Sequence, residues 1–244
     1  MSAPRVLVVE DQDELARVGA DRIVEGIEAT PEAKVVVATG RTPMGIYAEL
    51  AARRASGSFD PAGITVIQLD EYLGLGPEDR RSLDGWMRRS FVEPLGLGDD
   101  RVVRLPTDGN LRRAGLAFDR ALASRGGVDL AVLGLGSNGH LGFNEPPSDR
   151  DAPTRAVDLT PSTVSDNARY WGEVGDVPKR AVTLGMAPLL AARRIVLVAS
   201  GPSKRAIVRR VLEGPASPSV PATFLREIGS RVTVIVDRAV WGNG

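Results

Sequence analysis

Residues 129–146 read DLAVLGLGSNGHLGFNEP, an apolar run that leads into a glycine-rich loop. The run Asp129–Gly134 is almost continuously apolar instead of alternating between apolar and polar residues. Such a pattern is typical of a strand that is buried on both faces of a parallel sheet. Similar runs that predict strands are Arg5–Val9, Lys34–Ala38, Ile64–Leu69, Arg194–Ala199 and Val232–Asp237.

Longer segments with helical spacing lie between these strands. Asp11–Ala29 begins with acidic residues, which the positive end of a helix dipole favours. The other predicted helices are Pro43–Ser56, Ser82–Phe91, Leu111–Arg125, Thr160–Trp171 and Ser203–Glu213. Alternating strands and helices predict a Rossmann-like α/β fold, with an open, mainly parallel sheet and helices on both faces. No linker divides the chain, so we expect one domain over residues 1–244.

The composition excludes several classes of function. Lys plus Arg and Asp plus Glu both number 31, and this balance argues against a nucleic-acid partner. There is no cysteine and the only histidine is His140, so thiolate chemistry and multi-histidine metal sites are impossible. The N-terminus lacks a signal-like pattern and no apolar run is long enough to span a membrane, so we expect a cytoplasmic protein.

Polar residues follow four of the predicted strands. They are Thr39–Pro43, the adjacent carboxylates Asp70 and Glu71, the glycine loop that ends in His140, and Ser200–Lys204. Ligands of parallel sheets bind beyond the carboxyl ends of the strands. We therefore expect an anion-binding loop, a carboxylate pair, the only imidazole and a lysine at one edge, provided that the strands are parallel.

The glycine loop matches the dinucleotide pattern Gly-x-Gly-x-x-Gly over residues 134–139, and Asp158 lies near the distance expected of a ribose-binding acid. However, Pro146 and Pro147 follow where a dinucleotide fold needs an uninterrupted helix. We interpret the loop as one that brings its backbone close to a different ligand.

The turn Thr39–Pro43 is interpreted as a helix start, with Thr42 as the N-cap and Pro43 in the first helical position. The free amides of that first turn would favour an anion such as a phosphate ester, although the local sequence also fits an ordinary capped helix. Arg169 and Lys204 are candidate phosphate ligands. Trp86, Trp171 and Trp241 are interpreted as packing residues.

Neighbouring residues of a strand point to opposite faces, so at most one of Asp70 and Glu71 should enter a site. If Asp70 points inward, loss of solvent would raise its pKa toward that of a useful base. The alternative is that this pair only caps a helix or turn, and the local sequence leaves the two interpretations open. Glu145 is close enough in sequence to His140 to orient its ring.

Together these segments resemble the glucosamine-6-phosphate deaminase family, which also includes the 6-phosphogluconolactonases. The resemblance covers nearly the whole chain in the same order. It is carried by ATGRTP at 38–43, LDEY at 69–72, GLGSNGHLGFNEP at 134–146, VPKRAVTLG at 177–185 and GPSK at 201–204. The long segment ending in Asn-Glu-Pro favours the deaminase branch, because the lactonases differ after the glycine–histidine pair.

The resemblance implies conversion of glucosamine 6-phosphate and water to fructose 6-phosphate and ammonia through an enolamine, without a metal or organic cofactor. Asp70 would be the base that moves a proton from C2 to C1. His140 would help to open the pyranose ring, and Glu145 would orient the His140 side chain. Asn138 would complete the catalytic set. The residues implied to bind the substrate are Thr39, Gly40, Arg41, Thr42, Gly134, Gly136, Arg169 and Lys204.

Some positions depart from the family pattern. Arg41 stands where a second glycine is common, and would either add charge to the phosphate site or crowd it. Asn138 stands where some members carry Asp and others Asn.

The set that binds the activator N-acetylglucosamine 6-phosphate in some relatives is matched here by Ser148 and Arg155. Asp149 and Val157 do not match it. We therefore expect no activation by that ligand in a steady-state assay.

Two alternatives stay open at this stage. One is a lactonase or another aldose–ketose isomerase, which ammonia release would distinguish. The other is a sensor that binds sugar phosphates without turnover. The preferred aminosugar, motion of residues 160–171 as a lid, and the choice between a monomer and a small homo-oligomer are also open.

Overall fold

A seven-stranded sheet forms the centre of the computed structural model, which describes residues 3–76 and 79–242. Its strands follow the order β1-β10-β9-β6-β2-β3-β5, and every pairing between neighbours is parallel. The strands are β1 (Arg5–Val9), β2 (Lys34–Val37), β3 (Thr65–Gln68), β5 (Val102–Val103), β6 (Leu130–Gly134), β9 (Arg194–Ala199) and β10 (Val232–Asp237). The predicted parallel sheet is confirmed.

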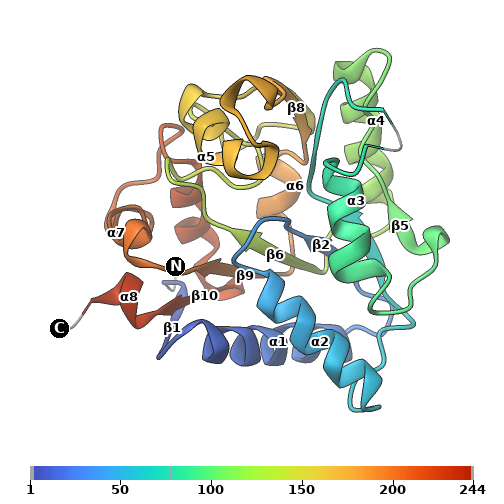
Figure 1. Cartoon of the computed structure of the whole chain (residues 1–244), viewed down its shortest axis with the longest axis vertical. Coiled ribbons are helices and arrows are strands. Elements are labelled where there is room, and N and C mark those ends of the chain that lie inside the picture. The colour runs from blue at the N-terminus through green and yellow to red at the C-terminus, as the bar shows by residue number, and fades with distance from the viewer. Residues whose placement is uncertain (1–2, 77–78, 243–244) are drawn as a thin grey trace.

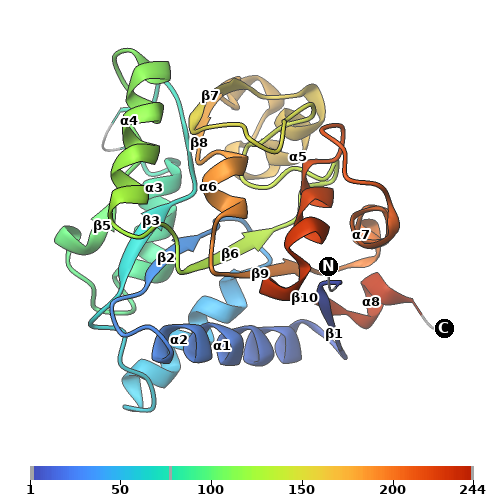
Figure 2. The ribbon, with the colours of Figure 1, turned by 180° about the vertical axis from the view of Figure 1, so that it is seen from behind.

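Helices cover both faces of this sheet (Figures 1 and 2). Alternate strand residues enter different cores, so that Val35 and Val37 pack with α1 (Gln12–Glu28) and α2 (Met44–Ala55). Val36 packs on the other face. The elements with side chains in that second core are α4 (Leu111–Ser124), α6 (Met186–Leu190), α7 (Arg205–Glu213) and the 3₁₀ segment Pro221–Arg231. This layering explains the near-continuous apolar runs, because both faces of each central strand are buried.

A second, three-stranded antiparallel sheet was not predicted. It has the order β4-β8-β7, from β4 (Asp70–Tyr72), β8 (Arg180–Thr183) and β7 (Arg155–Asp158). These strands are short and carry charged residues, so no apolar run marks them. Together with α3 (Leu83–Met87) and α5 (Pro161–Trp171), they build a small separate core around Tyr72 and Trp171.

Several predicted helix boundaries need correction. Helix α2 begins at Met44 with Pro43 in the N-cap position and no side-chain cap, so the assignment of Thr42 as N-cap is wrong. The predicted helix Ser82–Phe91 divides into α3 and a π-helical turn, Arg88–Val92. A 3₁₀ turn, Pro202–Lys204, precedes α7.

The chain between the main elements contains other short helices, namely the 3₁₀ turns Asp99–Arg101 and Val174–Asp176 and the terminal α8 (Arg238–Trp241). Trp241 in α8 is 44% exposed, so its interpretation as a packing residue is wrong. None of the helices in the described part of the chain combines the length and the apolar character needed to cross a bilayer.

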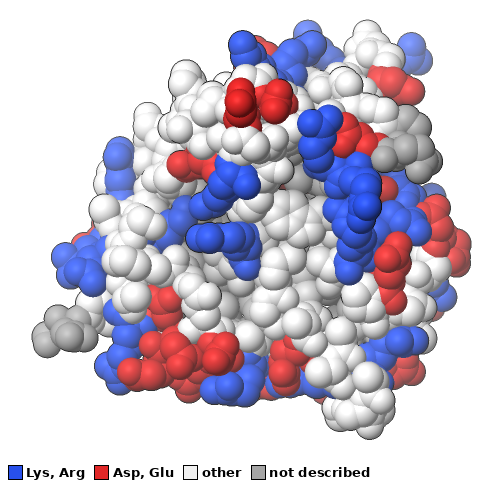
Figure 3. Space-filling view, viewed as in Figure 1, with Lys and Arg blue, Asp and Glu red and all other residues white. Residues whose placement is uncertain are grey.

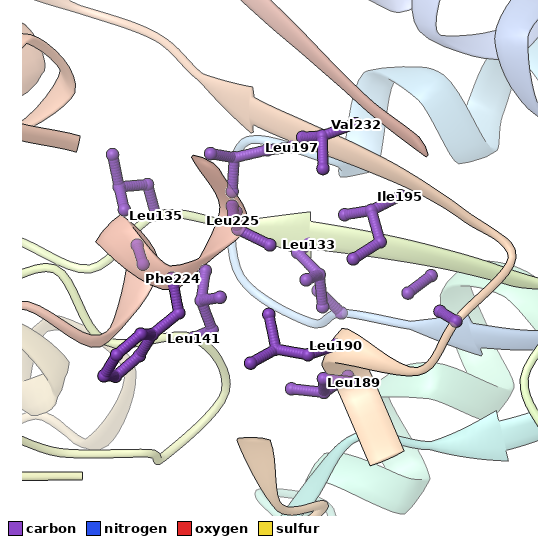
Figure 4. Packing of buried hydrophobic residues seen from close by; sticks show 14 of the residues in the cluster. Leu133, Leu135, Leu141, Leu189, Leu190, Ile195, Leu197, Phe224, Leu225 and Val232 are labelled. Atoms are coloured by element: carbon purple, nitrogen blue, oxygen red, sulfur yellow. The ribbon is translucent and has the colours of Figure 1, made fainter. Parts of the chain in front are cut away.

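The glycine loop after β6 is fixed to the core at both ends. Leu135 and Leu141 belong to one buried cluster with Phe224 and Leu225, and Figure 4 shows these side chains together. The backbone between the two leucines is therefore held in place although it contains few side chains that pack. The same cluster continues along β6 and β9 through Leu133 and Leu197.

Candidate active site

The four polar segments expected at one edge follow four strands that are adjacent in the sheet, β9, β6, β2 and β3. The segments that follow these strands carry Lys204, His140, the turn Thr39–Thr42 and Asp70, respectively. Parallel pairing directs all four loops to the carboxyl edge. The expected gathering at one edge is therefore confirmed.

His140 and Glu145 face one another within the glycine loop. The His140 Nδ1 atom lies 3.6 Å from Oε2 of Glu145, and their side chains are 16% and 6% exposed. The Nδ2 group of Asn138 donates to the same Glu145 oxygen at 2.9 Å, while Oδ1 of Asn138 accepts from the backbone N–H of His140 at 3.1 Å. Asn138 thus holds both the carboxylate and the backbone that carries the imidazole.

The start of α5 completes this cluster. The hydroxyl of Thr160, the N-cap of α5, donates to Oε2 of Glu145 at 3.2 Å. Thr163, one turn later, is buried, with its hydroxyl 3.4 Å from Nδ1 of His140. Neither hydroxyl had been assigned to the site from the sequence. The sequence signal for both hydroxyls was the N-cap residue Thr160, because the third residue of the helix, Thr163, lies on the same side of the helix as its N-cap.

The surroundings of Glu145 favour its ionised form. Burial acts to raise the pKa of Glu145. Hydrogen bonds from His140, Thr163 and Asn138 and the electrostatic interaction with His140 outweigh burial and lower the pKa to about 2. Its second oxygen, Oε1, is buried and has no hydrogen-bond partner among residues 3–76 and 79–242.

Asp70 and Glu71, the first residues of β4, have different environments. Burial, followed by the neighbouring charge of Glu71, raises the pKa of Asp70 from 3.8 to about 8. Glu71 accepts backbone N–H groups of Leu83 and Asp84 at 2.9 and 2.8 Å, and so caps α3. Burial raises the pKa of Glu71, while these amides act to lower it. The capping role left open for one of the carboxylates belongs to Glu71.

Thr183 of β8 connects Asp70 with the glycine loop. The two residues are paired in the antiparallel sheet, and the Thr183 hydroxyl accepts the backbone N–H of Phe143 at 3.1 Å. A Cβ added at Gly142 would come within 2.9 Å of that hydroxyl. The close approach of the loop to β8 therefore depends on a glycine at this position.

Basic residues lie in the last turn of α5 and at the start of α7. Burial lowers the pKa of Lys204, the nearby carboxylate of Asp166 acts to raise it, and the positive charge of Arg169 lowers it further. Asp166 accepts the hydroxyl of Ser137 at 2.6 Å, which connects α5 to the glycine loop. Arg41 is exposed on the neighbouring turn after β2. Figure 3 shows basic side chains on either side of an uncharged area between α5 and α3.

Asp237, at the end of β10, shapes the loop that precedes Lys204. Its carboxylate accepts the Ser200 hydroxyl at 2.5 Å and the Gly201 N–H at 3.0 Å. It also caps α8 through the backbone N–H of Val240 at 2.9 Å. Sequence reasoning missed this residue, although an acid that ends an apolar strand at the same edge was a usable signal.

A glycine is required at position 136 because the backbone there lies very close to the imidazole of His140. A Cβ at this position would lie 2.3 Å from Nε2 of His140. The nearby Gly139 has a φ of +85°, which L side chains rarely adopt. The glycines of the loop thus allow the backbone to approach His140 closely, and no helix begins between His140 and Thr154 to support a dinucleotide interpretation.

Arg155 is committed to contacts inside the protein. Its guanidinium donates to Oδ1 of Asn144 at 2.9 Å, to the Ser148 hydroxyl at 2.7 Å and to the carbonyl of Pro153 at 3.2 Å. The Ser148 hydroxyl in turn donates to the carbonyl of Glu145 at 2.5 Å. Both residues that match the activator-binding set therefore hold the turn around Glu145.

The sequence profile of the family described as glucosamine-6-phosphate isomerases/6-phosphogluconolactonase matches residues 10–234. The chain belongs to this family. A glucosamine-6-phosphate deaminase of Rhodopirellula baltica is 40% identical over 234 residues, which cover 95% of this chain and 92% of that protein. The resemblance inferred from the motifs is thereby confirmed.

Solved structures of the glucosamine-6-phosphate isomerase/6-phosphogluconolactonase family have the same fold. A monomeric glucosamine-6-phosphate deaminase superimposes with a TM-score of 0.92 at 34% identity, covering 97% of this chain and 98% of that one. The 6-phosphogluconolactonase from Trypanosoma brucei gives a TM-score of 0.77 at 23% identity, with 98% of each chain covered. At that identity the second likeness concerns the fold alone.

Proposed function

We propose that this chain is a glucosamine-6-phosphate deaminase that converts glucosamine 6-phosphate and water to fructose 6-phosphate and ammonia. The observation that carries the proposal is a buried, weakly acidic Asp70 on the same sheet edge as the His140–Glu145 pair. Family membership and the names of the relatives support this activity over the lactonase alternative.

Ring opening would use His140. A pyranose opens when a proton leaves the hydroxyl on C1 and another reaches the ring oxygen. Nε2 of His140 lies on the side of Gly136, away from Glu145, so it is the nitrogen available to the sugar. Glu145 fixes the orientation of the imidazole through Nδ1. Asn138, Thr160 and Thr163 position this pair.

Proton transfer between carbons would use Asp70. The ionised carboxylate removes the proton from C2 of the open-chain sugar while the ammonium group gives a proton to the oxygen on C1, which produces the enolamine. The carboxyl group then returns its proton to C1. The C2–N bond is then an imine, which water hydrolyses to the ketone with release of ammonia. A carboxylate with a raised pKa is a stronger base, and the ammonium group of the substrate would favour its ionised form on binding.

The phosphate would bind between the turn Thr39–Thr42 and the cations Lys204 and Arg169. Gly40, Arg41, Gly134 and Gly136 complete the proposed substrate contacts. A lysine with a partly buried ammonium group and the fork of an arginine both suit a dianion. Fixing the phosphate holds a flexible open-chain sugar so that C1 and C2 stay beside Asp70.

The proposal also includes a single domain, a cytoplasmic location, a monomer or small homo-oligomer, no organic cofactor and no nucleic-acid or membrane partner. A monomeric state is supported by the solved deaminase with 34% identity, which is itself monomeric. Size-exclusion chromatography with light scattering tests the assembly directly.

The test is incubation of the purified chain with glucosamine 6-phosphate, with ammonia and fructose 6-phosphate measured in parallel. Equal amounts of both products are expected without an added cofactor. Galactosamine 6-phosphate and a 6-phosphogluconolactone serve as comparison substrates. Lactone hydrolysis without ammonia would contradict the proposal, and tight binding without turnover would favour a sensor.

A further inference from the structure

A cavity of about 210 Å³ lies between α3 and α5, and its walls are aromatic and basic. The lining residues used below are Arg80, Arg81, Trp86, Arg89, Tyr170 and Trp171. None of the residues proposed to contact the sugar phosphate lines this cavity. The proposed reaction therefore does not account for this cavity.

The aromatic wall is held rigidly. Trp86 and Tyr170 pack edge to face with ring centres 4.9 Å apart, which connects α3 to α5. Trp171 packs in the same way on Tyr72 at 5.2 Å. The indole N–H of Trp86 donates to the sulfur of Met44 at 3.2 Å, so α2 also restrains its orientation. The cavity is thus a preformed space with apolar ring surfaces.

The rim of the cavity carries positive charge that the protein only partly balances. Arg81 pairs with Asp79 at 2.8 Å and lies over the Trp171 ring at 4.6 Å. Within residues 3–76 and 79–242, neither Arg80 nor Arg89 forms an ion pair, and Arg89 only donates to the carbonyl of Arg80 at 2.8 Å. All three arginines are exposed, so their guanidinium groups are accessible to a ligand.

We propose that this cavity is a second small-molecule site, which takes a compound with one ring and an attached phosphate. One guanidinium group can bind two phosphate oxygens at once, and aromatic side chains give the ring of a ligand a surface to pack against. The volume is below the roughly 300–1,000 Å³ of sites for drug-sized ligands, which limits the occupant to about one ring. The argument uses the cavity alone and does not depend on the proposed deaminase activity.

Tryptophan fluorescence provides a direct test. Trp86 and Trp171 line the cavity, whereas the third tryptophan, Trp241, is exposed on α8. In a Trp241→Phe background the signal therefore comes from the cavity. Phenyl phosphate is the probe, with inorganic phosphate and phenol to separate the contributions of the phosphate and the ring.

We expect phenyl phosphate to cause a saturable change in tryptophan fluorescence, and inorganic phosphate and phenol to bind more weakly. The double substitution Arg80→Gln/Arg89→Gln should raise the Kd at least about tenfold, because two charge-assisted contacts are lost. The matched control is Arg112→Gln/Arg113→Gln, which removes an equal charge from two exposed positions on α4 and should leave the Kd unchanged.

Substitution of Lys204 separates this site from the proposed phosphate site of the reaction. In a Lys204→Met background the titration with phenyl phosphate should be unchanged. A response that disappears with Lys204→Met and persists in Arg80→Gln/Arg89→Gln would overturn the proposal, and so would the lack of any saturable response. The single variant Arg80→Gln, whose side chain makes no described contact, gives the same test if the double variant does not fold.

Discussion

The imidazole of His140 is held on one side by the carboxylate of Glu145, with Nδ1 and Oε2 3.6 Å apart. The other ring nitrogen, Nε2, lies beside Gly136, where a Cβ would approach it to 2.3 Å. One nitrogen is thereby directed to a fixed acceptor and the other toward the glycine loop. This arrangement fixes the orientation of the ring without a bulky neighbour.

Gly136→Ala should displace the His140 ring while leaving the fold intact. The added methyl group overlaps the imidazole, and the backbone of Gly136 does not have a positive φ, so alanine itself is not strained there. We expect kcat to fall by about 10²-fold, the scale of general acid–base catalysis, with little change in Tm. Gly175→Ala, where a Cβ contacts nothing within 4 Å, is the control and should keep normal turnover.

Asp70→Asn should remove the proposed base. Turnover of glucosamine 6-phosphate should fall by roughly 10²-fold or more, because an amide does not accept the C2 proton. Binding of fructose 6-phosphate, measured by calorimetry, should persist, since the phosphate contacts are unchanged. Near-normal turnover in this variant would exclude Asp70 from the role.

The pH dependence should report the raised pKa of Asp70. Because the base acts when ionised, kcat/KM should rise with pH and level off above about 8. The amine and phosphate of the substrate also titrate, so the carboxyl stretch of Asp70 is measured independently by infrared difference spectroscopy against Asp70→Asn. Titration of that band near pH 4 would contradict the environment described for Asp70.

Asp70→Asn should also stabilise the protein at alkaline pH. Between the ordinary pKa of 3.8 and the folded value of about 8, the folded chain holds a proton that the unfolded chain has released. The free energy of unfolding therefore falls as the pH rises through this range. Asp70→Asn has no carboxyl group to ionise at this position. Its free energy of unfolding at pH 8 should therefore exceed that of the parent by at least about 1 kcal/mol, which corresponds to ~2–4 °C in Tm.

The control for this stability prediction is the difference in stability between variant and parent at a second, lower pH. Near pH 4 the variant and the parent should have similar stability, because the carboxyl is protonated in the folded state and only starts to ionise in the unfolded one. Asp108→Asn, at an exposed loop position, should show no pH-dependent gain. An Asp70→Asn variant that is less stable than its parent at pH 8 would refute the prediction.

Lys204→Met should weaken recognition of the phosphate. Loss of one charge-assisted contact is expected to raise KM for glucosamine 6-phosphate by about 10–100-fold. Binding of glucosamine, which lacks the phosphate, should be unaffected. Equal losses for the two ligands, measured by calorimetry, would show that Lys204 does not act on the phosphate.

Much of the main sheet is predictable because its strands are buried on both faces. Arg5–Val9, Arg194–Ala199 and Val232–Asp237 were predicted with the bounds that the structure has. The antiparallel sheet was missed because β4, β7 and β8 are short, contain charged residues and take their pairing partners from distant parts of the chain. The start of α2 was misplaced because Thr42 fits a cap by residue type, although its side chain makes no capping bond.

The amino-acid sequence by itself determined the alternation of strands and helices, the loops at the strand ends and the family, since these depend on local patterns and short motifs. Only the tertiary structure decided that both carboxylates are buried and that Glu71 is the one that caps α3. It also decided that Thr163 faces His140 across 23 positions of sequence. These outcomes depend on burial and on contacts between segments far apart in the chain, which no local pattern records.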